Sequence, residues 1–356
     1  MMNKKEYIRK DLENFTPYEA GDVTNAIKLD ANENPYKMDE KIRKDIIKWL
    51  DKEEGFSVYP DSNSNALREA IAKHYRVTKE QVVCGVGSDQ LIDCLIRGVV
   101  MPGDKVIYPS PSFSMYQSTI TLNHGTAIPV DLEEDFSYNI EKIIEACHKN
   151  DPKLLILCSP NNPTGNSLSL DQIKEIASQV KCLIMMDEAY VEFTQESAVS
   201  LVNEFENIVV LRTFSKAYGL AGLRIGYGIG SEKAIYPIEI AKPPYNINQF
   251  TQIVAQKVIE NPEMYTEHIK EMKQNRETLR QDLTKLGIKV YPSDANFLLV
   301  ECDDVDLDQI LKEKNIYIRK MNIRNKDMYR ISIGTQEQNQ LLLKSVREAW
   351  ENGAKK

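Results

Sequence analysis

One lysine stands among hydroxyl side chains in the stretch Thr213-Phe214-Ser215-Lys216, and Arg224 follows it eight residues later. A lysine that forms a Schiff base must lose its proton and reach an aldehyde, while a cofactor phosphate needs hydroxyl donors and a planar, permanently charged guanidinium. The spacing therefore suggests a site for pyridoxal phosphate. Taken alone, however, the stretch is better explained by a surface lysine in a glycine-containing loop, because most lysines are exposed.

Three other polar clusters follow apolar runs that are typical of strands. A glycine-rich turn, Gly85 to Asp89, opens a helix and offers backbone N–H groups to a phosphate. Asn162 lies in a loop stiffened by two prolines, and Asp187 ends a wholly apolar run. An ordinary turn or a helix N-cap would also explain these residues. Ligands gather at the carboxyl ends of parallel strands, so we expect the clusters to meet there.

These residues must be positioned by the secondary structure around them. From about residue 80, short apolar runs typical of strands alternate with helical segments, which predicts an α/β fold with a mostly parallel sheet. The clearest helix start is a capping box at Ser169 and Gln172. The predicted strands span residues 81–84, 105–108, 154–157, 183–186, 208–211 and 225–229.

The pattern changes near Lys242-Pro243-Pro244, because two prolines cannot continue a helix or a central strand. Helical segments follow at about 249–286, 306–314 and 336–351, with short strands at 296–300, 316–319 and 329–333. These elements predict a smaller α+β domain. We expect residues 30–240 to form the large domain, and residues 1–29 and 241–356 to form the small one.

The composition excludes several classes of function. The 356 residues carry a formal charge of −8, and the basic residues are scattered, so neither nucleic acid nor a membrane surface is an expected partner. We find no signal peptide or membrane span, which favours a cytoplasmic location. Six cysteines without C-x-x-C spacing and four dispersed histidines give no reason to expect a disulfide or a metal site.

Together the motifs resemble the fold-type I pyridoxal phosphate aminotransferases over nearly the whole chain. Within that superfamily the sequence is most similar to the class-II histidinol-phosphate aminotransferases. This resemblance implies a seven-stranded, mostly parallel sheet flanked by helices, beside the smaller domain. The strings that carry it are Leu29 to Pro35, Tyr59-Pro60-Asp61, Gly87-Ser88-Asp89, Ser159 to Gly165, Asp187 to Tyr190, the segment around Lys216, and Lys242 to Asn248.

The resemblance implies roles in holding the cofactor. Lys216 would carry it and later move a proton between the substrate Cα and the cofactor, and Asp187 would bind the pyridine nitrogen. Asn162 and Tyr190 would bond the phenolic oxygen. The phosphate would be held by Ser88, Asp89, Thr213, Ser215 and Arg224.

Three further positions concern the cofactor ring and a second subunit. Tyr59 would reach the cofactor phosphate of a neighbouring subunit, which implies a homodimer with shared sites. Phe113 stands where the family stacks an aromatic ring, often tyrosine, over the pyridine, so a hydroxyl is lost here. Gln90 replaces the glutamate expected after Gly-Ser-Asp.

For the substrate, Arg330 matches the residue that clamps a donor carboxylate, and Arg319 matches the one that faces a distal anion. Asn32 and Tyr18 lie in the segment that folds over the substrate in the family. Without the resemblance, both arginines would be taken for surface charges.

The implied activity is transfer of the amino group of L-histidinol phosphate to 2-oxoglutarate, giving imidazole-acetol phosphate and L-glutamate. The reaction would be ping-pong, through pyridoxamine phosphate, and would serve histidine biosynthesis. Aromatic amino acid aminotransferase and threonine-phosphate decarboxylase stay open as alternatives. A transcription regulator with an aminotransferase-like domain is disfavoured, because it needs an added DNA-binding module.

Overall fold

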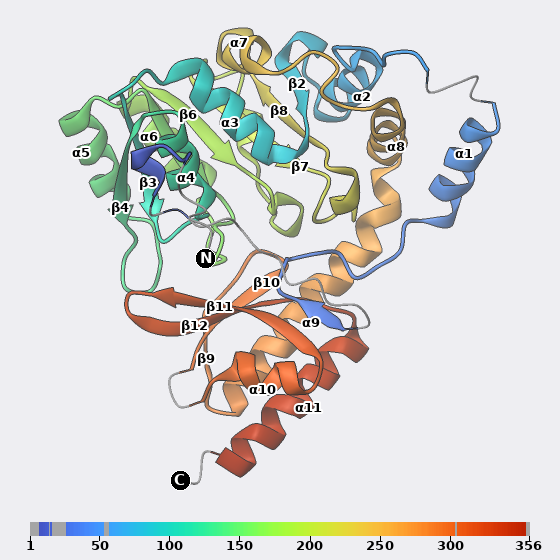
Figure 1. Ribbon diagram of the computed structural model, residues 1–356, viewed down its shortest axis with the longest axis vertical. Helices are drawn as coiled ribbons and strands as arrows, with labels where there is room; N and C mark the ends of the chain where they lie inside the picture. The colour runs from blue at the N-terminus through green and yellow to red at the C-terminus, as the bar shows by residue number, and fades with distance from the viewer. Residues whose placement is uncertain (1–6, 14, 16–25, 53–56, 303–304, 354–356) are drawn as a thin grey trace.

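The computed structural model describes residues 7–13, 15, 26–52, 57–302 and 305–353. Its centre is a seven-stranded sheet of order β2-β8-β7-β6-β5-β3-β4 (Figure 1). Only β8 runs against the other strands of this sheet. The strands are β2 (Val82–Gly85), β3 (Lys105–Ser110), β4 (Thr126–Asp131), β5 (Leu154–Cys158), β6 (Leu183–Asp187), β7 (Ile208–Thr213) and β8 (Gly226–Gly230).

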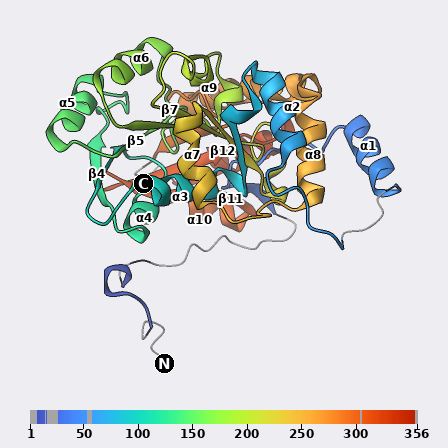
Figure 2. The same ribbon diagram turned by 90° about the horizontal axis from the view of Figure 1, so that it is seen from above.

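Helices cover both faces of this sheet. On β5, Leu155 and Leu157 face one apolar core, while Leu154 and Ile156 face the other. The first face is covered by α2 (Asn65–Tyr75), α5 (Ile140–Asn150) and α6 (Leu170–Gln179), and the second by α3 (Gly87–Val99), α4 (Met115–Leu122) and α7 (Glu232–Ala241). In Figure 2, α5 and α6 lie across the strands from α3 and α4. Burial on both faces explains why the strands read as continuous apolar runs.

A second, five-stranded sheet of order β1-β11-β12-β10-β9 lies below the first in Figure 1. Residues from the N-terminal part of the chain belong to this sheet, since β1 pairs in parallel with β11. Arg9, by contrast, donates to the carbonyl of Leu122 at the end of α4. The strands are β1 (Ile27–Leu29), β9 (Lys289–Val290), β10 (Phe297–Glu301), β11 (Ile316–Ile323) and β12 (Lys326–Ser332), and the helices are α9 (Thr266–Lys285), α10 (Leu307–Glu313) and α11 (Gln336–Gly353). Two other helices, α1 (Glu40–Leu50) and α8 (Gln249–Ile259), pack on each other, and α8 also contacts α2.

The predicted α/β fold is confirmed, with all six expected strands of the large sheet present within two residues at each end. The capping box of Ser169 and Gln172 also forms, at the start of α6. The seventh strand, β4, was not among the strands read from the apolar runs. It lies at the sheet edge, is only partly buried and contains Pro129, so its sequence lacks the signal of a buried strand.

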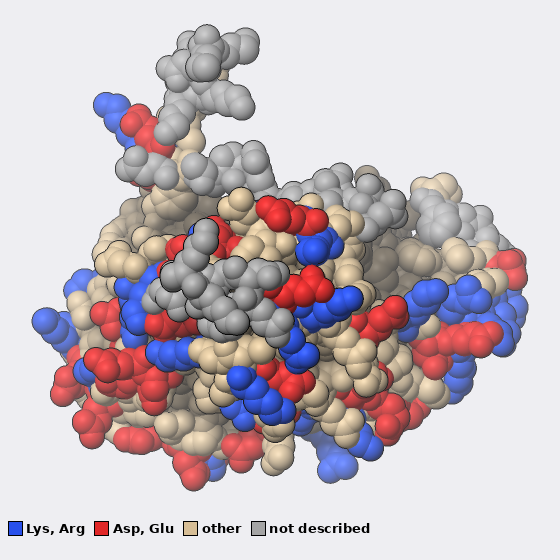
Figure 3. All heavy atoms as spheres, turned by 90° about the horizontal axis from the view of Figure 1, so that it is seen from below, with Lys and Arg blue, Asp and Glu red and all other residues tan. Residues whose placement is uncertain are grey.

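The described surface mixes charges of both signs. Figure 3 shows basic and acidic side chains intermingled over the face that is seen from below. No helix in the described part of the chain is both long and apolar enough to cross a bilayer.

Candidate active site

The carboxyl ends of three neighbouring parallel strands bring the predicted residues together. Asn162 follows β5, Asp187 ends β6, and Lys216 follows β7. Cys158 pairs in register with Asp187, and Asp187 with Leu211, so the strands end side by side. The sheet thereby converts residues far apart in sequence into one site.

Asp187 lies deep in this edge, with 3% of its surface exposed. One carboxylate oxygen accepts a hydrogen bond from the Tyr116 hydroxyl at 2.6 Å, and the other accepts one from the backbone N–H of Ala189 at 3.1 Å. Burial raises the pKa of Asp187 to about 6, and the two hydrogen bonds oppose that rise. The carboxylate is thus oriented and can be ionised at neutral pH.

The amine of Lys216 points toward the residues that follow β1. Its Nζ donates to the carbonyl of Ala31 at 2.9 Å and lies 5.8 Å from the centre of the Tyr190 ring. Burial, helped by the charge of Arg330, lowers the pKa of this lysine to about 8. An amine with this pKa is partly unprotonated near neutrality, as Schiff-base formation requires.

Tyr190, which follows β6 of the large sheet, contacts Asn32, which follows β1 of the small sheet. The Tyr190 hydroxyl accepts a hydrogen bond from Asn32 Nδ2 at 2.9 Å, and burial raises the pKa of Tyr190 to about 12. Asn32 has a left-handed backbone, φ 54°, which asparagine tolerates better than most residues. Its backbone N–H donates to Ser332 Oγ, whose hydroxyl donates back to Asn32 Oδ1.

Arg330 on β12 reaches from the small sheet to the large one. Its Nη1 donates to Asn162 Oδ1 at 2.7 Å, and its Nη2 donates to the carbonyl of Asp30 at 2.5 Å. Arg319 on β11 stands directly opposite Arg330 in the antiparallel register. Residues opposed in this way share one face of the sheet, so the two guanidinium groups belong to the same side.

The predicted phosphate site surrounds the start of α3. This helix begins without a side-chain cap, so its first N–H groups are not satisfied by a capping residue. Arg224 Nη2 bonds Asp89 at 2.9 Å, and a Cβ on Gly87 would lie 2.8 Å from the same nitrogen. Thr213 and Ser215 are buried and bond each other through their hydroxyls at 2.9 Å. Ser88, in the first turn, is partly buried.

Such a cradle fits the group that the sequence predicts. The glycine, the uncapped helix start and the guanidinium suit a phosphate. The carboxylate of Asp187 suits a pyridine nitrogen, and Lys216 suits an aldehyde. The residues present therefore suit three groups of pyridoxal phosphate: its phosphate, its pyridine nitrogen and its aldehyde.

The remaining predicted residues make other contacts. Tyr59 is 80% exposed and stacks on Tyr245 at 4.5 Å. Phe113 is partly buried and meets Tyr116 edge to face at 5.6 Å. Gln90 accepts hydrogen bonds from the N–H of Val86 and from Asn246 through one amide oxygen, contacts that a carboxylate oxygen could also make. Tyr18 lies outside the described residues.

Several residues that support the site were not predicted. Tyr116 bonds Asp187, and Asn34 Nδ2 donates to the carbonyl of Ala217 beside the lysine. Arg212, inside β7, is 5% exposed and bonds Glu188 through Nε and Nη2 at 3.0 and 2.8 Å. The only sequence signal for Arg212 was a charged residue that continues an apolar strand.

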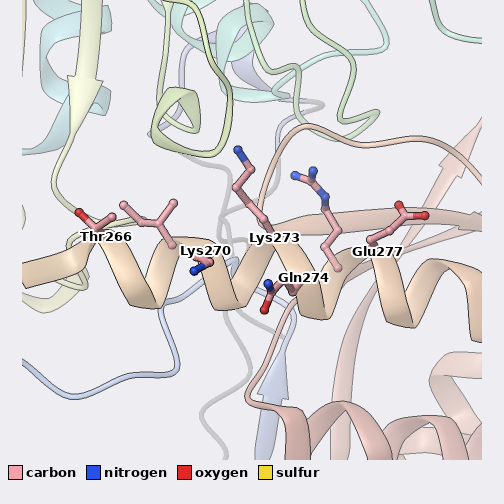
Figure 4. A pocket seen from close by; sticks show the side chains of 7 residues that line it. Thr266, Lys270, Lys273, Gln274 and Glu277 are labelled. Atoms are coloured by element: carbon pink, nitrogen blue, oxygen red, sulfur yellow. The ribbon is translucent and has the colours of Figure 1, made fainter. Parts of the chain in front are cut away.

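A hollow of about 600 Å³ lies along α9, and none of the predicted site residues that the structure describes lines it. Figure 4 shows Lys273 pointing from α9 toward the loops opposite. The lining comes from one helix face, mostly long polar side chains, without the convergent polar groups that fix a ligand. We therefore place the chemistry at the edge of the seven-stranded sheet.

A mostly parallel sheet whose carboxyl edge gathers a buried aspartate, a lysine of lowered pKa and an anion cradle defines a pyridoxal phosphate-dependent enzyme of fold type I. A family model described as "Aminotransferase class I and II" matches residues 24–346, and the chain belongs to this family, whose members use pyridoxal phosphate.

Individual relatives match over almost their full lengths. The chain is 38% identical to a histidinol-phosphate aminotransferase of Ruminiclostridium cellulolyticum, over 95% of this chain and 97% of the relative. It is 37% identical to that of Pyrococcus furiosus, over 96% and 97%. The crystal structure of histidinol-phosphate aminotransferase from Sinorhizobium meliloti in complex with pyridoxal-5'-phosphate matches with a TM-score of 0.88, over 98% of each chain at 21% identity, which shows the shared fold.

Proposed function

We propose that this chain is a transaminase that moves the amino group of L-histidinol phosphate to 2-oxoglutarate, giving imidazole-acetol phosphate and L-glutamate. The observation that carries the proposal is the pair Arg319 and Arg330, directly opposed on β11 and β12. Two guanidinium groups on one face of the sheet suit substrates with anionic groups, because a guanidinium binds a carboxylate or a phosphate through paired hydrogen bonds. The proposed substrates each bring a phosphate or carboxylate to this face. The names of the full-length relatives support the same substrate.

The contacts of the described residues support the proposed roles. When bound, pyridoxal phosphate draws electrons from the bond that breaks at the substrate Cα. Lys216 Nζ would take and return the proton at that carbon, because its lowered pKa lets the amine exist unprotonated. Asp187 would face the pyridine nitrogen, and Asn162 and Tyr190 the phenolic oxygen. The phosphate would contact Ser88, Asp89, Thr213, Ser215 and Arg224.

Substrate binding would involve the small sheet and the segment before α1. Arg330 would bind the carboxylate of L-glutamate or 2-oxoglutarate, exchanging its present bond to the Asn162 amide for an ion pair. Arg319 would bind the distal anion, and Asn32 and Tyr18 would lie against the substrate. In this proposal residues 30–240 form the large, cofactor-binding domain, while residues 1–29 and 241–356 form the small domain with the N-terminal segment.

The working unit in this proposal is a cytoplasmic homodimer. Tyr59 and its neighbour Val58 are 80% and 67% exposed, and Tyr245 stacks on Tyr59. An exposed apolar patch of this kind suits a protein interface, and a second subunit would let Tyr59 reach the partner's cofactor phosphate. Buried thiols such as Cys84 and Cys158 suit a reducing compartment.

The test is a half-reaction of the cofactor-loaded protein with L-histidinol phosphate, L-phenylalanine or O-phospho-L-threonine, followed by the cofactor absorbance. We expect rapid conversion to the pyridoxamine form with histidinol phosphate alone. A comparable rate with phenylalanine would mean a broad aromatic aminotransferase. Release of carbon dioxide from phosphothreonine would mean a decarboxylase, and the proposal would then be wrong.

A further inference from the structure

Asp187 does not hold its position alone. Tyr116, in the first turn of α4, donates its hydroxyl to Asp187 Oδ2 at 2.6 Å. The side chain is 1% exposed, its hydroxyl bonds Asp187, and the Cys158 thiol also lies beside that hydroxyl. Its ring also meets Phe113 edge to face, with centroids 5.6 Å apart and planes at 88°. One tyrosine therefore contacts two of the residues expected to touch the cofactor ring.

We infer that Tyr116 is a positioning residue of the cofactor site: its hydroxyl orients Asp187 and keeps it ionised, and its ring supports Phe113. The inference rests on the proposed function, since it takes Asp187 as the partner of the pyridine nitrogen. Tyr116 touches neither the substrate nor the reacting atoms in this arrangement. It acts through the carboxylate.

The hydroxyl matters because Asp187 has few other partners. Ala189 N–H bonds the opposite oxygen at 3.1 Å, and burial disfavours the charged form. Tyr116 is itself buried beside this negative charge, so its pKa lies well above the usual range and the hydroxyl stays a donor. Other groups that influence Asp187 are Asp89 from α3 and the adjacent Glu188, both of which raise its pKa.

The consequence concerns the location of one proton. A pyridine nitrogen and a carboxylate in contact share a proton, which lies on the nitrogen as long as the carboxylate is stabilised as an anion. Removal of the Tyr116 hydroxyl would leave Asp187 Oδ2 without its strongest donor, and hydrogen bonds to charged groups are the stronger ones. The proton would then shift from the ring nitrogen toward Asp187, and the ring would withdraw electrons less well.

The experiment compares Tyr116→Phe with two other variants, each loaded with cofactor carrying ¹⁵N in the ring. Tyr108→Phe is the matched control, because Tyr108 is buried and packs edge-on against Tyr116 at 6.4 Å without contacting Asp187. Asp187→Asn tests the parent assignment. The readouts are the ring ¹⁵N chemical shift at neutral pH, the dissociation constant of the cofactor and the melting temperature of the cofactor-free protein.

We expect Tyr116→Phe to move the ¹⁵N shift toward that of a neutral pyridine and to weaken cofactor binding about tenfold. Tyr108→Phe should match the wild type, and the melting temperature should be nearly unchanged in both. In an Asp187→Asn background, Tyr116→Phe should have no further effect on the cofactor.

Three outcomes would overturn the inference. An unchanged ¹⁵N shift in Tyr116→Phe beside a changed one in Asp187→Asn would refute the role of Tyr116 alone. An unchanged shift in Asp187→Asn would refute the proposed cofactor site itself. A loss of folding in Tyr116→Phe would mean that the hydroxyl serves stability rather than the ring nitrogen.

Discussion

Glu192 is a buried carboxyl that the proposed chemistry does not use. Its side chain is 9% exposed, and neither oxygen accepts a hydrogen bond from another of the described residues. The nearest cation is Arg212, whose Nη1 lies 3.6 Å from Oε1 and donates instead to the Tyr75 hydroxyl at 2.6 Å. The other donors of Arg212 are directed at Glu188 and Ser197. The guanidinium is therefore near Glu192 but bonded elsewhere.

This arrangement makes stability depend on pH. Burial raises the pKa of Glu192 from 4.5 to about 7 in the folded protein, although the charge of Arg212 opposes the rise. Below pH 4.5 the group is neutral in both states and has no effect. As pH rises to 7 the unfolded chain loses this proton first, so the folded state is destabilised by about 1.4 kcal/mol per pH unit. The cost levels off near 3 kcal/mol above pH 7.

Replacing Glu192 by glutamine should remove that dependence. We expect the free energy of unfolding of Glu192→Gln, minus that of the wild type, to rise by about 2 kcal/mol between pH 5.5 and pH 8.5. Urea unfolding of the cofactor-loaded proteins, followed by circular dichroism, measures the difference. Glu206→Gln is the control, since that carboxylate is 74% exposed. A difference that does not change with pH would refute the reasoning, and a less stable Glu192→Gln at pH 8.5 would mean that Arg212 holds Glu192 as an anion.

Three other predictions test the site and its support. Lys216→Ala should abolish turnover and the absorbance of covalently bound cofactor, whereas Lys233→Ala, at an exposed lysine, should change neither; retained turnover would refute the catalytic role. Arg319→Ala should lower kcat/KM for histidinol phosphate more than for phenylalanine, and equal losses would exclude a role in reading the phosphate. Arg212→Met should lower the free energy of unfolding by about 3–5 kcal/mol, because it leaves Glu188 charged and buried; a loss below 1 kcal/mol in urea unfolding would contradict this.

The residues at the strand ends could be predicted because each is identified by the residues next to it in the sequence. Asn162, Asp187 and Lys216 each follow an apolar run, and parallel strands place such positions on one edge. Three of the five strands of the small sheet, β10, β11 and β12, were predicted in the same way, whereas the short strands β1 and β9 were not. That these residues meet depended on the sheet being parallel, which alternation of strands and helices indicates, and also on β5, β6 and β7 being neighbours in the sheet.

What the sequence could not predict depends on register and on contacts between elements. The opposition of Arg319 and Arg330 follows from the pairing of β11 with β12, and a shift by one residue would have placed the two side chains on opposite faces. Tyr116 comes from α4, and only the packing of that helix brings it to Asp187. From the sequence, Arg212 is only a charged residue within an apolar strand. Its role depends on partners from other elements, which the sequence does not identify.

If Asn162 and Tyr190 face the cofactor as proposed, the contacts between the two sheets would also decide which of their atoms do so. Arg330 donates to Asn162 Oδ1, so the amide can present its Nδ2 hydrogens to another acceptor. Asn32 Nδ2 donates to the Tyr190 hydroxyl, whose own proton can then be donated in turn. The small sheet and the N-terminal segment thus make both groups donors, as a negatively charged phenolic oxygen would require. In the proposed mechanism Arg330 would release the Asn162 amide when it binds a substrate carboxylate. Substrate binding would then change the hydrogen bond that Asn162 donates to the phenolic oxygen of the cofactor. The Asn162 amide would thus couple the contact between the two sheets to the electron distribution of the cofactor ring.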